Sequence, residues 1–146
     1  MSKLPATARP TGKSIAPAVL LAYQQAWIAD QSPVKVCEKS RRIGLSWSEA
    51  SEDALVAATA RDAGGMDVWY IGYNKDMAQE FIRDVGFWAK HYQVAASSME
   101  QDVFADGDER EILTFVIRFA SGFRVTALSS RPTNLRGKQG VVIIDE

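Results

Sequence analysis

The sequence has one cysteine, no long apolar run and almost no net charge, and each shortage excludes a class of protein. Cys37 alone can form neither an internal disulfide nor a cysteine-based zinc site. No apolar run approaches the roughly 20 residues of a membrane-spanning helix, and the N-terminus lacks the apolar stretch of a secretory signal. With 17 basic and 18 acidic residues, any nucleic-acid binding would need a local basic patch. We therefore expect a soluble intracellular protein without a membrane segment.

The remaining composition is that of a folded domain. The chain has 146 residues, of which 47% are hydrophobic, enough to bury one core. Residues 1–15 differ, because Pro5, Pro10 and Gly12 stand there among scattered serine and threonine residues. Such a segment seldom becomes ordered by itself. We predict a disordered segment over residues 1–15 and one domain over residues 16–146.

The stretch VKVCEKSRRIGLSWSEA, residues 34–50, changes character around a basic, glycine-containing turn. The apolar run that includes Val34 and Val36 predicts a short buried strand before the turn. Trp47 and Ala50 begin a pattern of helical spacing after it. A strand-to-helix loop directs backbone N–H groups and the positive end of a helix dipole at one small volume. The stretch therefore predicts an anion site.

The rest of the chain alternates between predicted helices and strands. Asn74 is expected to cap a long helix, because the apolar residues after it recur every three or four positions. The acidic stretch over residues 97–111 is expected to form a loop. The other predicted elements, in chain order, are a helix from about Pro17 through Ile28, a helix from about Ser46 to Gly64, a strand at MDVWYIG, a hairpin of EILTFVIRFA and FRVTALSS joined at Ser121 and Gly122, and a strand at VVII.

The last six residues, VVIIDE, place two carboxylates at the end of an apolar strand. Four consecutive β-branched residues are typical of a strand buried on both faces in a parallel sheet. Ligands of such sheets bind at the carboxyl ends of the strands, where the phosphate loop and the acidic pair can face one ligand. Phosphoryl transfer needs both kinds of group. On that logic Ser46 and Asp145 would hold Mg²⁺, and Glu146 would polarise the attacking water.

The loop itself matches only half of the standard phosphate-loop pattern G-x-x-x-x-G-K-[ST]. When Gly44 and Ser46 are aligned with its second glycine and its hydroxyl residue, Lys39 replaces the first glycine and Leu45 replaces the lysine. A loop that curls around phosphates brings its two ends together. The long side chain of Lys39 can therefore still reach the β and γ phosphate oxygens.

Several stretches together resemble one family, the large terminase subunits of tailed phages, which are the motors that package DNA into capsids. EKSRRIGLSW resembles the deviant Walker A loop of this family, particularly of its Mu-like branch. AYQQAWIAD is similar to its adenine-recognition segment, and SSRPTNLRGKQGVVIIDE to its basic loop and Walker B strand. YIGYNKDMAQEFI also looks like the Mu-like members. The matches follow the family's order over about residues 17–146.

The resemblance implies a RecA-like P-loop NTPase core, an α/β fold with a mostly parallel sheet flanked by helices, and the cofactors ATP and Mg²⁺. It implies that Gln24, beside Tyr23, hydrogen-bonds the adenine edge. It implies that Lys39 contacts the β and γ phosphates, and that Asp145 and Glu146 are the metal-binding and catalytic carboxylates. One of two loop arginines would stabilise transition-state charge. The full implied phosphate loop is Lys39, Ser40, Arg41, Arg42, Ile43, Gly44, Leu45 and Ser46.

The sequence stops where members of that family continue, so we interpret it as the N-terminal part of an ATPase domain, truncated after the Walker B strand. One strand edge is then expected to lose its cover. The resemblance implies that the intact motor acts on double-stranded DNA with a portal protein and a small terminase subunit, as a homo-oligomer in the host cytoplasm. Two alternatives stay open: a helicase-like ATPase and a truncated, non-catalytic nucleotide-binding fragment. The basic loop with Arg131, Arg136 and Lys138 can contact phosphate or DNA, or simply be solvated.

Overall fold

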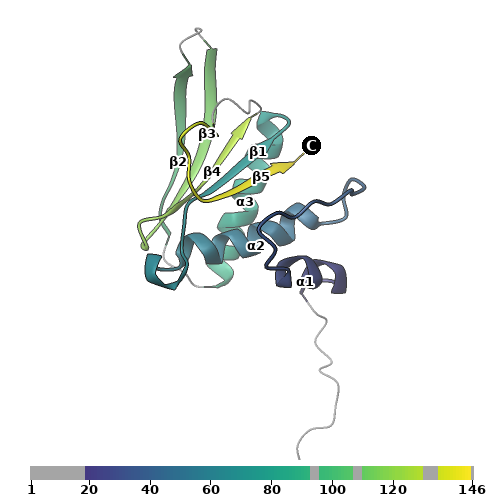
Figure 1. Cartoon of the computed structure of the whole chain (residues 1–146). Helices are drawn as coiled ribbons and strands as arrows, with labels where there is room; N and C mark the ends of the chain where they lie inside the picture. Colours follow the sequence, from purple (N-terminus) through teal and green to yellow (C-terminus); the bar gives the residue numbers. More distant parts are fainter. Residues whose placement is uncertain (1–18, 93–95, 107–109, 130–134, 146) are drawn as a thin grey trace, which may run out of the picture.

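The structure, a computed structural model, describes residues 19–92, 96–106, 110–129 and 135–145, and its fold is α/β (Figure 1). The expected disorder of residues 1–15 lies outside this part of the chain. The elements are α1 (Ala22–Ala29), α2 (Leu45–Ala58), the 3-10 turn η1 (Arg61–Ala63), β1 (Val68–Gly72), α3 (Lys75–His91), β2 (Ala96–Asp106), β3 (Arg110–Phe119), β4 (Arg124–Ser129) and β5 (Val141–Asp145).

The sheet has five strands in the order β2-β3-β4-β1-β5. β1 pairs in parallel with β4 on one side and with β5 on the other, while β2, β3 and β4 pair antiparallel. The sheet is therefore mixed, and the expectation of a mostly parallel sheet is wrong for the half that carries β2 and β3. The loop expected over residues 97–111 is also wrong, because this stretch forms most of a long hairpin.

The core lies between the sheet and the two helices α2 and α3, which pack against each other (Figure 1). On α2 it is built from small residues at helical spacing, Ala50, Ala54 and Ala57, which let the helix lie close to its neighbours. On α3 the predicted stripe supplies large residues, among them Phe81 and Trp88. The predicted stripe is thus confirmed as core, and the Asn74 cap is confirmed by a 2.9 Å hydrogen bond from the Met77 N–H to its Oδ1.

Three other predictions have mixed outcomes. The hairpin joined at Ser121 and Gly122 is confirmed by the antiparallel pairing of β3 with β4. The buried strand expected around Val34 and Val36 is wrong: this stretch has no regular secondary structure, and both valines are exposed because no described strand lies beside them. β5 forms as expected, but it is an edge strand and is not buried on both faces.

The helix boundaries differ modestly from the prediction. α1 begins at Ala22, while Pro17 lies outside the described residues. α2 ends at Ala58 instead of near Gly64, and η1 fills part of the difference. In the described part of the chain, none of the helices combines the length and the apolar character that crossing a membrane requires.

Candidate functional site

The loop before α2 has the backbone conformation of a tight turn around a small volume. Gly44 is the N-cap of α2 and adopts the left-handed region with φ of 75°. Arg42 also has a positive φ, 60°, which is uncommon for a residue with a side chain. Strained backbone of this kind collects at ligand-binding turns. The loop therefore leads into the N-terminus of α2 through two left-handed residues, one of which is not a glycine.

Asp145, the last residue of β5, is the centre of the site. The Ser46 hydroxyl donates a 2.5 Å hydrogen bond to Asp145 Oδ2, across 99 residues of sequence. Lys39 Nζ lies 2.9 Å from Asp145 Oδ1 and forms an ion pair. The hydroxyl of Tyr70 on β1 donates a 3.0 Å hydrogen bond to Oδ2. Three predicted site residues, Lys39, Ser46 and Asp145, thus converge, together with one that was not predicted.

The surroundings keep Asp145 ionised although it is buried. Burial alone raises the pKa of a carboxyl group, but hydrogen bonds from Ser46 and Lys39 and the Lys39 charge outweigh it, so the pKa of Asp145 is below its usual value. Burial, together with the same carboxylate, raises the pKa of Tyr70. Tyr70 therefore stays protonated and acts as a donor to the carboxylate.

Tyr70 was missed because its role depends on sheet register. It lies opposite Ile143 in the parallel β1–β5 pair, so its side chain is on the same face of the sheet as Asp145. Its ring stacks on Phe81 of α3, with centroids 3.8 Å apart and planes 7° from parallel. The available signal was a tyrosine inside an otherwise apolar buried strand, since a buried hydroxyl usually has a hydrogen-bond partner.

Side chains of helix α1 hold the loop before α2 by hydrogen bonds to the backbone carbonyls of that loop. Gln24 is buried, and its Nε2 donates a 2.8 Å hydrogen bond to the carbonyl of Gly44, while its Oε1 accepts one of 2.8 Å from the Leu21 N–H. The Tyr23 hydroxyl donates to the carbonyl of Ile43. The two residues predicted at the adenine therefore contact the backbone of the loop before α2.

The other predicted loop residues fall into two groups. Leu45, at the position of the standard lysine, is buried. Ser40, Arg41 and Arg42 are exposed. Glu146, predicted as the catalytic carboxylate, lies outside the described residues.

The basic loop before β5 leads into the start of that strand, whereas Asp145 lies at the end of the strand. Lys138 Nζ lies 4.7 Å from the centroid of the Trp69 ring, near the start of β5, whereas Asp145 lies at its end. Arg136 is exposed on the same loop, and Arg131 lies outside the described residues. Lys138 is therefore at the opposite end of the strand from Asp145.

The donors at the site fit Mg²⁺. This ion is usually held by one or two carboxylates and completes its shell with water and substrate phosphates. Asp145 offers a carboxylate and Ser46 a hydroxyl next to it. The described residues contain no group of three or more His, Cys, Asp or Glu side chains that could hold a metal ion by themselves.

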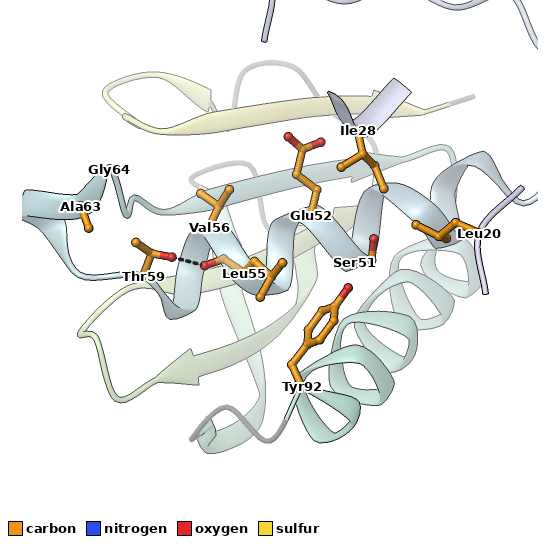
Figure 2. A pocket seen from close by; sticks show the side chains of 10 residues that line it. All are labelled: Leu20, Ile28, Ser51, Glu52, Leu55, Val56, Thr59, Ala63, Gly64 and Tyr92. Atoms are coloured by element: carbon orange, nitrogen blue, oxygen red, sulfur yellow. Dashed lines mark hydrogen bonds between the residues drawn. The ribbon is translucent and has the colours of Figure 1, made fainter. Parts of the chain in front are cut away.

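A separate shallow cavity of about 270 Å³ lies on the outer side of α2 (Figure 2). It is lined mainly by apolar groups of α2, such as Leu55 and Val56, with Leu20, Ile28 and Tyr92 around them. Glu52 is the charged residue of its lining. An apolar wall with a carboxylate does not suit phosphate, so this cavity is not the anion site.

The chain is similar to two proteins of Mu-like phages. It is 54% identical over 129 residues to the Mu-like prophage FluMu protein gp28 of Haemophilus influenzae, and 46% identical over 131 residues to the probable terminase, large subunit gp28, of Escherichia phage Mu. Each alignment covers 88% of this chain but only 25% and 24% of the two relatives. No family model matches the chain, and no solved structure is detectably similar to it. The chain is a homologue of both gp28 proteins and spans about a quarter of their length.

Proposed function

We propose that this chain, a homologue of the gp28 proteins of Mu-like phages, is part of the ATP-binding and ATP-hydrolysing motor of a DNA-packaging terminase large subunit. Its core would be a RecA-like P-loop NTPase fold, with residues 39–46 as the phosphate loop. The observation that carries this proposal is the convergence of Lys39, Ser46 and Asp145 at the N-terminus of α2.

The ion pair between Lys39 and Asp145 supports a phosphate-binding role for the lysine. An ammonium group beside a buried carboxylate is neutralised when no ligand is bound. A triphosphate would offer Lys39 a stronger anionic partner, while Asp145 and Ser46 would turn to Mg²⁺. The metal, when bound, neutralises charge on the β and γ phosphates. We propose that Tyr70 keeps the Asp145 carboxylate oriented during this exchange.

The remaining roles rest on the homology and on the loop conformation. One of Arg41 and Arg42 would stabilise charge in the transition state, and both are exposed on the loop. Glu146 follows Asp145 directly and would polarise the attacking water. The Gln24 amide has one N–H and one lone pair beyond its two hydrogen bonds, the pair that an adenine edge requires, and Tyr23 lies next to it.

We propose the same partners that a terminase motor needs: double-stranded DNA, a portal protein and a small terminase subunit. The intact motor would work as a homo-oligomer in the cytoplasm of the host cell. This chain covers about a quarter of its relatives, so these partners concern the intact protein.

The test is steady-state ATP hydrolysis by the intact protein and three variants. Lys39→Ala should lower turnover by roughly a hundredfold or more, because it removes a phosphate clamp. Leu45→Lys in the Lys39→Ala background should not restore turnover, because Leu45 is buried. Lys35→Ala is the matched control, since the Lys35 ammonium pairs with Glu52 at 3.2 Å and not with Asp145.

Near-normal hydrolysis by Lys39→Ala would end the assignment of the phosphate loop. ATP binding without turnover in the wild-type protein would instead favour a non-catalytic nucleotide-binding role. Equal losses in Lys39→Ala and Lys35→Ala would point to general destabilisation, which thermal unfolding of both variants would reveal.

A further inference from the structure

The basic loop before β5, yellow in Figure 1, is folded into a turn and bonded to the sheet. The Lys138 N–H donates a 3.1 Å hydrogen bond to the Leu135 carbonyl, which closes the turn, and Gly137 within it has φ of 74°. The Gln139 carbonyl accepts a 3.0 Å hydrogen bond from the indole N–H of Trp69 on β1. The backbone of the basic loop is therefore held against the sheet.

The end of the same loop lies directly against the residue that precedes β1. Gly140 has φ of 125°, and a Cβ atom added there would lie 2.0 Å from the carbonyl oxygen of Asp67. The Val141 N–H donates a 2.9 Å hydrogen bond to the same carbonyl. Only glycine permits two backbones to approach this closely, so the loop has one position relative to the sheet.

Two cations of this region lie against the ring of Trp69. Lys138 Nζ is 4.7 Å and the guanidinium carbon of Arg124 is 5.2 Å from the ring centroid. Trp69 stands between Val68 and Tyr70, which belong to the core under the helices, so its side chain is on the other face of the sheet. Contact with the ring orders two long cationic side chains before any ligand binds, which lowers the entropy cost of binding.

The positive charge around Trp69 is not neutralised within the described ranges. Arg124, Arg136 and Lys138 form no ion pair there, since the ion pairs of this part of the chain belong to other lysines. One carboxylate is close, because Asp67 Oδ1 accepts a 3.1 Å hydrogen bond from the backbone N–H of Arg124. We call Trp69, Arg124, Arg136 and Lys138 the basic patch. It is the kind of local patch that a chain of formal net charge −1 needs in order to bind nucleic acid.

We propose that the basic patch contacts the phosphate backbone of double-stranded DNA. The inference rests on the proposed motor function, which supplies DNA as the partner. Trp69 is only 4% exposed, so an unpaired base cannot stack on its ring, and this favours a duplex over a single strand. Arg136 and Lys138 are both exposed and are separated by a glycine, which leaves room for a duplex to reach both cations. Contacts with phosphate carry no sequence information, so this binding is independent of DNA sequence.

The position of the patch separates DNA contact from nucleotide chemistry. Lys138 lies before the start of β5, and Asp145 is the last residue of that strand. Trp69 and Tyr70 are neighbours on β1, but their side chains are on opposite faces of the sheet. Loss of the patch cations should therefore weaken DNA binding and leave ATP hydrolysis in the absence of DNA unchanged.

The first test is binding of a short fluorescent duplex to the intact protein over a range of salt concentrations. The Arg136→Gln/Lys138→Gln variant should lose roughly tenfold or more in affinity at about 0.1 M salt. The slope of log affinity against log salt should fall by about 1 for each lost phosphate contact. Arg83→Gln/Lys90→Gln is the matched control, because it removes the same two charges from exposed positions of α3, on the helix-covered side of the sheet.

Three results of this titration would overturn the proposal. The first is an unchanged salt slope in the patch variant, and the second is an equal loss in the patch variant and the control. The third is unchanged duplex binding together with weaker binding of a polyglutamate peptide, which would assign the patch to an acidic protein.

The second test is ATP hydrolysis without DNA, which separates this inference from the proposed motor function. The patch variant should hydrolyse ATP like the wild-type protein, whereas Lys39→Ala should lose hydrolysis and keep the wild-type salt slope for DNA. Normal hydrolysis by Lys39→Ala would contradict the nucleotide site while the patch would still be supported by the DNA titration. A patch variant that loses both hydrolysis and thermal stability would show that the patch is structural, and this would overturn the inference.

Discussion

Gly44→Ala tests two separate effects at the proposed phosphate loop, the strain of a left-handed backbone and the contact of an added Cβ atom with a neighbouring side chain. Gly44 has φ of 75°, and a Cβ atom added there would lie 2.7 Å from the Nε2 of Gln24. The variant must therefore accept a left-handed alanine and also displace the side chain that holds the loop. Both effects act on the same residue, but they have different controls.

The magnitude follows from the two costs. A left-handed residue other than glycine costs about 1 to 2 kcal/mol. Displacing Gln24 breaks its 2.8 Å hydrogen bond to the Gly44 carbonyl and leaves a buried amide unsatisfied, which costs about 1 to 3 kcal/mol. The free energy of unfolding should therefore fall by about 2 to 5 kcal/mol.

Gly137→Ala is the control for strain. Gly137 has φ of 74°, nearly that of Gly44, and no atom of the described residues lies within 4 Å of an added Cβ. Its substitution should cost only the strain, about 1 to 2 kcal/mol. In a Gln24→Ala background the side chain that an added Cβ atom would meet is absent. There Gly44→Ala should also lower the free energy of unfolding by only about 1 to 2 kcal/mol.

The assay is urea denaturation, followed by circular dichroism, of the wild-type protein, the three single variants and the Gln24→Ala/Gly44→Ala double variant, with ATP affinity measured in parallel. Gly44→Ala should be the least stable single variant and should lose ATP affinity, whereas Gly137→Ala should keep it. Equal destabilisation by Gly44→Ala and Gly137→Ala, or a Gly44 effect that Gln24→Ala does not change, would refute the role of Gln24 in holding the loop.

Three further predictions concern single side chains. Arg42→Gly should stabilise the protein by about 1 kcal/mol, because it removes a left-handed arginine at φ of 60°. If Arg42 is the catalytic arginine, the turnover of ATP falls while the stability rises. If turnover is unchanged, the catalytic role belongs to Arg41. Burial raises the pKa of Asp53 well above its usual value of 3.8, so above that pH the native state holds a proton that the unfolded state releases, and wild-type stability declines as pH rises. Asp53→Asn removes this decline and should therefore stabilise the protein more at higher pH. Urea denaturation at pH 4 and pH 7.5 measures the difference, and an equal effect at both pH values would contradict the reasoning. Tyr70→Phe should raise the pKa of Asp145, because it removes a 3.0 Å hydrogen bond to the carboxylate; carboxyl NMR titration measures the shift, and an unchanged pKa would show that the hydroxyl does not stabilise the charge.

Local signals made most of the helical structure predictable. The Asn74 cap and the stripe that contains Phe81 and Trp88 needed only the spacing along one helix. The hairpin turn at Gly122 was equally local, with φ of 91° at the glycine. The β2–β3 hairpin was missed over residues 97–111 because the acidic residues of this stretch favour a loop. The strand around Val34 and Val36 was wrong because a strand requires a neighbour, which local sequence does not reveal.

The candidate site was predictable where general rules of α/β sheets apply. Ligands of parallel sheets bind at the carboxyl ends of the strands, so the convergence of Lys39, Ser46 and Asp145 could be expected from the sequence, and these three side chains do meet at the end of β5 although the strand expected before the loop does not form. Tyr70 could not, because its place beside Asp145 depends on the register of β1 against β5. The bond from Gln24 to Gly44 depends on how α1 packs on α2, a contact between elements that carries no local signal.

The most direct test of a Mg²⁺·ATP site at Lys39, Ser46 and Asp145 is calorimetric titration of the intact protein with a non-hydrolysable ATP analogue, with Mg²⁺ and with EDTA. The account predicts that Mg²⁺ strengthens binding to the wild-type protein, that Ser46→Ala removes this gain while keeping the metal-free affinity, and that Lys39→Ala weakens binding under both conditions. Identical affinities for the three proteins, with or without Mg²⁺, would contradict it.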